Sequence, residues 1–516
     1  MDHNRRSFLK KMGYGAGAVA MAPALSGCNF FDTLSKSDVP TDAIPKMVEL
    51  WEHISSSSIG HEKLGEFIDT FGTRMVGTQP LRDSEEYCIN LFGEIGISPV
   101  EPWQFKAQVW NRNTCTVEIE RKESGVWEPL DVICFARSPD ETLISEDSEA
   151  ELVYVGDFVP DNSISTTYAN KVILATGAGG DEKLGRGEKA ERFAQHGALA
   201  LIIINKRDVL NAAGAGIPDS KRAIAIPALN IKKTDGEELR DYLLERGSSP
   251  IKIKASITNK NWESKEEINI VAELQGSEKP DEIIVVGGHI DSWDLGPGAV
   301  DNGSGCFTII DIANAFMQIG YQPKRTIHFV LFGAEEQGMM GSEAYIAEMT
   351  SRGLRENLKY YVNIDMSGNA KGFNTFGVPE AKQMLDNLGE VIREIYPEYI
   401  NENRDHMVGF GSDQRSFLVD GVPSLNPYHD MEIGEERLQE IYHTHMDTMD
   451  KISVDDVKRH SQIIGTVIMR LCDEPLPRAR FSDAELPFYF RKFGKEAELR
   501  KKGLWKDEWD HGPAFK

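Results

Sequence analysis

The sequence lacks an excess of basic residues, an internal repeat and several familiar catalytic signatures. Its 516 residues contain 57 Lys and Arg against 82 Asp and Glu, a formal net charge of -25. This charge argues against nucleic acid as a partner, because no broad basic surface is available to meet phosphates. No Gly-x-Ser-x-Gly elbow, phosphate-binding loop, dinucleotide fingerprint or His-Glu-x-x-His helix occurs. Serine hydrolase, kinase and dehydrogenase functions are therefore disfavoured.

Cysteine is also scarce. The chain has 6 cysteines, and setting Cys28 aside leaves an odd number without the paired spacing of a zinc finger. At least one of them must be free or pair with another chain. Their apolar neighbours favour buried, hydrophobic cysteines.

The first 28 residues are predicted to be an export signal. Arg5 and Arg6, followed by Ser-Phe-Leu-Lys, resemble a twin-arginine signal, and the apolar stretch 12–25 is too short for a stable membrane span. Leu-Ser-Gly-Cys at 25–28 resembles the lipobox of bacterial lipoproteins, in which Cys28 is lipidated. We therefore expect an exported lipoprotein of the bacterial cell envelope, on the periplasmic or the outer-membrane side, that contacts the membrane only through its lipid anchor.

The remaining length predicts two or three folded units. Composition and patterning divide the chain into a linker, a catalytic domain split into two segments, an inserted domain and a C-terminal extension. The predicted bounds are 29–45 for the linker, 46–135 and 257–475 for the catalytic domain, 140–256 for the insert and 476–516 for the extension.

Alternating strand-like and helical segments predict an α/β fold with a mixed, mostly parallel sheet flanked by helices. Two or three strands are expected between Val100 and Phe135. The insert reads as a small α/β domain without a cluster of His, Cys and carboxylates, and it resembles the protease-associated domain. We expect it to be an accessory unit without catalytic groups.

Imidazoles and carboxylates follow the predicted strands of the catalytic segment. They are His289, Asp291, Asp301, the pair Glu335 and Glu336, Asp365 and a later His443. Because reactive groups gather at the carboxyl ends of the strands in such folds, these side chains are expected to converge. One His with two carboxylates could hold one divalent ion, and a shared Asp, a Glu and a second His could hold another. Two Zn²⁺ ions and a hydroxide would balance the charge of three carboxylates.

These blocks resemble the co-catalytic dizinc metallopeptidases, metallopeptidase family 28. The similarity spans roughly 60–475 and is greatest to the plasma glutamate carboxypeptidase branch, a dipeptidase; it is carried by 288–294, 323–326, 334–338 and 443–449.

The resemblance implies roles for individual residues. His289 and Asp365 would bind one zinc, and Glu336 and His443 the other, with Asp301 bridging them. Glu335 would be the general base, and Asp291 would orient the imidazole of His289. A strained peptide bond would join Asp301 and Asn302.

Some assignments stay open. His445 competes with His443 as a ligand, although His443 occupies the position after an aromatic residue that the family uses. Tyr442 and Asp413 are candidates for contacts with substrate.

The expected function is an exported zinc exopeptidase that hydrolyses dipeptides or N-terminal residues of short peptides by a two-metal mechanism with a Glu base. A broad aminopeptidase is the alternative within this class. A glutaminyl cyclase on the same scaffold would use one zinc and lack the insert, and an inactive binding module would have gaps among the ligands. Related enzymes dimerise, so a homodimer is a further expectation.

Overall fold

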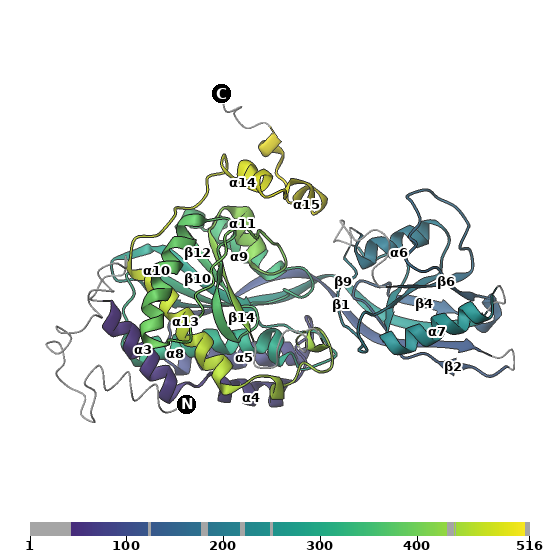
Figure 1. Ribbon diagram of the computed structural model, residues 1–516, viewed down its shortest axis with the longest axis horizontal. Helices are drawn as coiled ribbons and strands as arrows, with labels where there is room; N and C mark the ends of the chain where they lie inside the picture. Colours follow the sequence, from purple (N-terminus) through teal and green to yellow (C-terminus); the bar gives the residue numbers. More distant parts are fainter. Residues whose placement is uncertain are drawn as a thin grey trace.

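The computed structural model describes residues 43–121, 125–176, 184–216, 222–247, 251–430, 438 and 440–510. Figure 1 shows two lobes joined by a long ribbon of two strands, β1 and β9. The predicted export signal, including Cys28, and most of the predicted linker lie outside the described residues.

The larger lobe contains the helices and strands of the predicted catalytic segments and of the C-terminal extension. Its helices are α3 (Ile44–Ser57), α4 (Gly60–Phe71), α5 (Gln79–Glu94), α8 (Gly305–Gln318), α9 (Met340–Ser351), α10 (Pro379–Ile395), α11 (Gln414–Asp420), α13 (Val454–Asp473), α14 (Leu486–Lys492) and α15 (Glu496–Lys501). Its strands are β10 (Lys279–His289), β11 (Arg325–Phe332), β12 (Leu358–Asn363), β13 (Asn369–Asn374) and β14 (Ser424–Asp430), and it shares β1 (Val100–Glu120) and β9 (Ile251–Leu274) with the smaller lobe.

The smaller lobe contains the predicted insert. Its elements are β2 (Glu128–Pro129), β3 (Val132–Cys134), β4 (Glu141–Ile144), β5 (Glu151–Tyr154), β6 (Lys171–Thr176), α6 (Arg186–Gln195), β7 (Ala200–Ile204), β8 (Ala228–Ile231) and α7 (Lys233–Glu245).

The described strands join into a mixed sheet that passes through both lobes. Its order is β13-β14-β12-β10-β11-β9-β5-β6-β7-β8-β3. In the larger lobe β11, β10, β12 and β14 run parallel, and β9 is antiparallel to β11. In the smaller lobe β5, β6, β7 and β8 are parallel. The predicted α/β class, a mostly parallel sheet with flanking helices, is confirmed.

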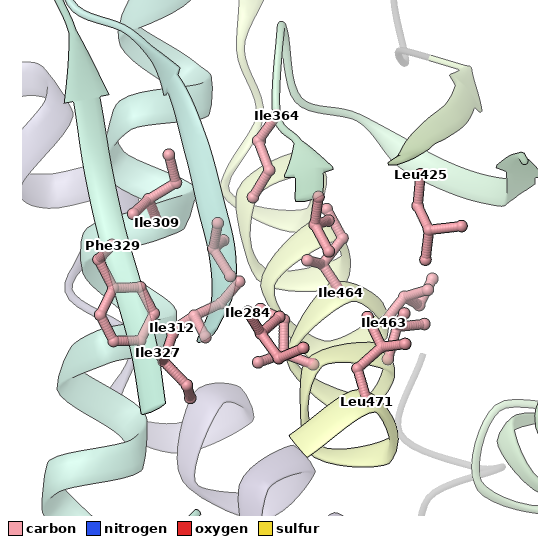
Figure 2. Packing of buried hydrophobic residues seen from close by; sticks show 14 of the residues in the cluster. Ile284, Ile309, Ile312, Ile327, Phe329, Ile364, Leu425, Ile463, Ile464 and Leu471 are labelled. Carbon is pink, nitrogen blue, oxygen red and sulfur yellow. The ribbon is translucent and has the colours of Figure 1, made fainter. Parts of the chain in front are cut away.

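The main core lies between this sheet and the helices that cover one of its faces. Figure 2 shows Ile284, Ile327 and Phe329 of the strands facing Ile309 of α8 and Ile464 of α13. Every residue of β11 is buried, as expected for a parallel strand covered on both sides. Helix α13 starts at a capping box, because the Ser453 hydroxyl accepts the Asp456 N–H at 3.0 Å.

The region 100–135 contains three strands, β1, β2 and β3, as predicted. Strand β1 is the longest of them, and it pairs with β9 along almost its whole length. The polar run Asn111–Thr114 coincides with a register shift between Arg112 and Thr114. The far end of β1 packs in the core of the smaller lobe, where Val117 and Ile119 meet Leu174 and Leu229. The ribbon is thus shared by both lobes, and the predicted boundary between residues 256 and 257 lies within β9.

The C-terminal extension packs on the larger lobe through Phe490, Leu499 and Trp509, and its Lys501 Nζ lies 2.8 Å from Glu188 Oε2 of α6. The described cysteines are free thiols, four of them buried and Cys115 partly exposed. Among the described residues, no helix combines the length and the apolar character needed to cross a membrane.

Candidate metal centre

The residues predicted to bind metal come from the ends of three neighbouring strands and from two loops. His289 is the last residue of β10, and Glu336 and Asp365 follow β11 and β12. Asp301 lies in the irregular turn η2 (Ala299–Ser304), which leads into α8. Because β10, β11 and β12 are parallel, their carboxyl ends meet at one edge of the sheet.

The structure brings these side chains together with His443. His289 Nε2 lies 3.1 Å from Asp301 Oδ1 and 3.4 Å from Asp365 Oδ1. His443 Nε2 lies 3.2 Å from Asp301 Oδ2 and 3.1 Å from Glu336 Oε2. Asp301 therefore contacts one imidazole with each of its carboxylate oxygens, and it divides the cluster into two halves.

The second candidate imidazole lies differently. His445 is exposed to solvent, whereas the His443 side chain is largely buried. The His443 ring stacks on the Tyr442 ring at 3.7 Å between centroids and meets the Trp293 ring edge-on at 5.9 Å. The geometry thus favours His443 as the member of the cluster.

The donor set fits a divalent transition metal. Ligand atoms of His289, Asp301 and Glu336 all lie within 4.8 Å of one another. Within the described part of the chain, Glu336 Oε1 and His443 Nε2 are buried without a hydrogen-bond partner. Buried polar atoms normally have partners, and imidazole nitrogens with carboxylate oxygens are the donors that zinc takes in proteins. A bound cation would satisfy these atoms.

Burial and mutual repulsion set the electrostatics of the carboxyl groups. Burial raises the pKa of Glu336 to about 7, with the His443 ring opposing that change. Burial also raises the pKa of Glu335 well above its usual range, and the charges of Asp413, Glu336 and Asp365 add to the effect. Glu335 is therefore suited to hold a proton.

Two buried side chains hold the cluster in place: Asp447, to which the sequence analysis gave no role, and Asn302, which it named only for the peptide bond to Asp301. Asp447 accepts the N–H groups of Val300 at 2.6 Å and Asp301 at 3.1 Å. The Asn302 amide donates to the Ile364 carbonyl at 2.9 Å, next to Asp365. The Asp301–Asn302 peptide bond is cis. The sequence shows that Asp447 lies near His443 and that Asn302 follows Asp301, but it does not show the backbone groups that these side chains bind.

Asp291 contacts the His289 imidazole through its main chain. The His289 Nδ1–H donates to the backbone carbonyl of Asp291 at 3.0 Å, while the Asp291 carboxylate is 3.7 Å from that nitrogen. The carboxylate instead accepts the backbone N–H groups of Glu335 at 3.0 Å and Glu336 at 3.2 Å. Asp291 thus fixes the Glu335–Glu336 loop with its side chain and the imidazole with its main chain.

The two candidates for substrate contact differ in exposure. Tyr442 is 42% exposed. Asp413 is fully buried at the start of α11, and neither of its carboxylate oxygens has a hydrogen-bond partner in the described structure. Burial raises the pKa of Asp413 to about 7, against the opposing charge of His289.

The smaller lobe also reaches the cluster, which the sequence analysis did not foresee. The Ala212 N–H donates to the His443 carbonyl at 2.7 Å, and Asn211 Nδ2 donates to the Tyr442 carbonyl at 3.0 Å. Arg137 donates to the carbonyl of Gln337 at 2.9 Å. These contacts involve backbone carbonyls, which leave no signal in a sequence.

Comparison with known proteins shows similarity to a family. The profile of Peptidase family M28 matches residues 269–468, and that of the PA domain matches residues 148–239. Carboxypeptidase Q of Xenopus laevis is 27% identical over 398 residues, which cover 76% of this chain and 81% of that protein. The probable lipoprotein aminopeptidase LpqL of Mycobacterium tuberculosis is 25% identical over 481 residues, or 85% of this chain and 89% of that protein.

Solved structures agree on the fold. A peptidase M28 precursor from Shewanella amazonensis superposes with a TM-score of 0.72 at 21% identity, covering 86% of this chain and 99% of that one. The chain is therefore similar to peptidase family M28 over residues 269–468 and to the PA domain over residues 148–239, ahead of the matched peptidase region.

Proposed function

We propose that the chain is an exported, lipid-anchored exopeptidase that holds two zinc ions and hydrolyses dipeptides or the N-terminal residues of short peptides. The observation that carries this proposal is the position of Asp301, whose two oxygens contact His289 on one side and His443 on the other. A carboxylate in this position suits a bridge between two cations. The similarity to a peptidase family supplies the reaction class.

The ligands divide between the two ions by proximity. His289 and Asp365 would hold one ion, Glu336 and His443 the other, and Asp301 would be shared. When bound, zinc polarises the carbonyl of the scissile peptide and lowers the pKa of water.

Glu335 is the residue proposed to move the proton. Its side chain is buried beside the ligands, and its backbone is fixed by the Asp291 carboxylate. It would accept a proton from the attacking water and pass that proton to the leaving amine. Glu336, although adjacent in sequence, points to His443, so the two neighbouring carboxylates have different tasks.

Asp413 and Tyr442 are proposed to contact substrate. The unpartnered, buried carboxylate of Asp413 suits the free ammonium group of a peptide, since such a group would supply the missing hydrogen bonds. Tyr442, stacked on the His443 ring and partly exposed, would line the approach to the centre.

A panel of dipeptides tests the proposal. The protein is stripped with a chelator, reloaded with Zn²⁺, and assayed on dipeptides with free or blocked ends. We expect two zinc ions per chain and hydrolysis of free dipeptides. Loss of activity on blocking only the amino end indicates an aminopeptidase, and loss on blocking either end indicates a dipeptidase. One ion per chain without peptide hydrolysis would overturn the proposal and favour the cyclase.

The proposed location has its own test. The basic start, the lipobox at Cys28 and the similarity to a probable lipoprotein aminopeptidase support it. Cys28→Ala should move the protein from the membrane fraction to the soluble fraction. An unchanged distribution would contradict lipid anchoring.

A further inference from the structure

The PA domain contacts the main chain at a proposed metal ligand. Two consecutive carbonyls, those of Tyr442 and His443, accept hydrogen bonds from Asn211 Nδ2 at 3.0 Å and from the Ala212 N–H at 2.7 Å. His443 has a left-handed backbone conformation, with φ of 60°, which a non-glycine residue adopts only when its surroundings fix it. These contacts therefore hold the backbone of a residue in a left-handed conformation.

The loop that makes these contacts is held by one buried side chain. Asn230, on β8, is fully buried. Its Oδ1 accepts the Asn211 N–H at 2.9 Å, and its Nδ2 donates to the Asn211 carbonyl at 3.1 Å. The same Oδ1 accepts from Asn205 Nδ2 at 2.8 Å, and Asn205 also donates to the Val209 carbonyl at 2.6 Å. The Asn230 side-chain amide thus bonds both the N–H and the carbonyl of Asn211, the residue that contacts the Tyr442 carbonyl.

Packing alone does not call for asparagine at this position. Strand β8 is buried throughout, and its other members are Ala228, Leu229 and Ile231. An amide in such a strand costs desolvation unless all its hydrogen bonds are made. Three of the four side-chain hydrogen bonds of Asn230 are made with Asn205 and Asn211, and the longest, from Nδ2 to the Ile133 carbonyl of β3, is 3.3 Å. The polarity of Asn230 therefore serves mainly the shape of the loop.

A continuous set of contacts therefore runs from the PA domain to one half of the metal centre. It starts at Asn230, passes through Asn211 to the backbone of 442–443, and ends where His443 Nε2 contacts Asp301 and Glu336. The other half, formed by His289 and Asp365, is held within the larger lobe by β10 and the segment after β12.

We propose that Asn211 and Asn230 are positioning residues of the metal centre, through which the PA domain fixes His443 for the ion it shares with Glu336. This inference rests on the proposed function in that His443 is taken as a zinc ligand. It adds an asymmetry between the two ions. A change in the 211–212 loop should lower the affinity for the ion at Glu336 and His443 and leave the affinity for the ion at His289 and Asp365 unchanged.

Metal-binding measurements on three variants test the asymmetry. Asn211→Ala removes the side chain that donates to the Tyr442 carbonyl, and Asn230→Ala removes the amide that bonds the backbone of Asn211. Asn259→Ala is the matched control, because Asn259 is also buried and donates to a backbone carbonyl, that of Pro139 at 2.8 Å, away from the 442–443 loop. Zinc affinity is measured for each ion by competition with chelators, and the Co²⁺-substituted proteins are compared by visible absorption.

We expect both loop variants to keep one ion with wild-type affinity and to bind the second about tenfold more weakly, the lower end of the effect of losing an outer partner of a ligand. The Co²⁺ absorption of that second site should change as well. The control should match the wild type in both readouts.

Wild-type affinity for both ions in Asn211→Ala would overturn the inference. That variant decides alone if Asn230→Ala fails to fold, since Asn211 is only partly buried. Equal weakening of both ions would also contradict it. A wild-type protein that binds no zinc would refute the proposed function instead, so the two failures are distinguishable.

Discussion

The two lobes carry parallel strands of the same kind, yet their carboxyl ends differ in chemistry. In the larger lobe, β10 ends at His289 and β11 and β12 lead to Glu335 and Asp365. In the smaller lobe, the described residues that follow β7 and β8 are Asn205 and Lys232. The same architectural edge is thus a buried ionisable cluster in one lobe, whereas in the other lobe Asn205 bonds the Asn230 amide and Lys232 forms an exposed ion pair with Asp131. The fold supplies the place, and the residues at that place decide the chemistry.

The two lobes also differ in the backbone segments that their buried polar side chains hold. Buried carboxylates such as Asp447 hold the backbone of the metal centre, whereas Asn230 holds a loop of the PA domain. We infer that the larger lobe contributes charge and proton transfer and the smaller lobe contributes shape. The following variants break or sharpen this division.

The largest effect is expected at the proposed base. Glu335→Gln keeps the size of the side chain but cannot take a proton, so kcat should fall about 10²–10⁴-fold while the zinc content stays that of the wild type. Turnover of a dipeptide and metal analysis of the same sample measure both. Normal hydrolysis by this variant would remove Glu335 from the mechanism.

The next largest effect is expected on stability, from a substitution that creates a cavity in the smaller lobe. Leu174 is fully buried on β6, and Leu174→Ala should lower the free energy of unfolding by about 3 kcal/mol. Zinc affinity should not change, because Leu174 lies outside the 211–212 loop. Denaturant unfolding and chelator competition give the two values. A parallel loss of zinc affinity would show that the lobes are not separable in this way.

The pH dependence of stability should come from the larger lobe. Burial raises the pKa of Glu85 to about 8, with Arg82 opposing the change. The folded protein therefore keeps a proton that the unfolded chain has lost, and stability should fall as the pH rises from about 5 to 8, by about 3 kcal/mol.

Glu85→Gln should flatten this dependence, and thermal unfolding at several pH values measures it. Glu86→Gln, at the exposed neighbouring position, is the control and should leave the slope intact. A slope that persists in Glu85→Gln would assign the dependence to other groups.

A smaller effect is expected at Asp447. Asp447→Asn preserves the volume but weakens the acceptor of the Val300 and Asp301 N–H groups, so zinc affinity should fall about tenfold. Asp473→Asn is the matched control, because Asp473 accepts the Lys324 N–H at 3.1 Å and the Tyr321 hydroxyl at 2.9 Å, away from the proposed ligands. Equal zinc affinity in both variants would deny Asp447 a positioning role.

The sequence predicted what local patterns encode. Apolar runs such as 283–286 and 326–332 marked the parallel strands, and polar residues placed just after them, such as Glu336 and Asp365, marked the edge where they converge. His289, Glu336 and Asp365 were therefore accessible from their position along a strand, whereas Asp301 and His443 lie in loops and were assigned from the family resemblance.

Contacts between distant segments were not accessible in the same way. The Asp291 carboxylate binds the backbone at 335–336, and Ala212 binds the carbonyl of His443. Backbone groups are the same in every residue, so no residue type marks such a partner. The length of β1 belongs to the same class, because the pairing of β1 with β9 joins segments about 150 residues apart.

The central claim is that two zinc ions lie on either side of Asp301. Anomalous diffraction at the zinc edge, from crystals of the protein loaded with Zn²⁺, tests it most directly. We predict two peaks about 3.5–4 Å apart, one beside His289 and Asp365 and the other beside Glu336 and His443. A single peak, or side chains that point away from the peaks, would contradict the account.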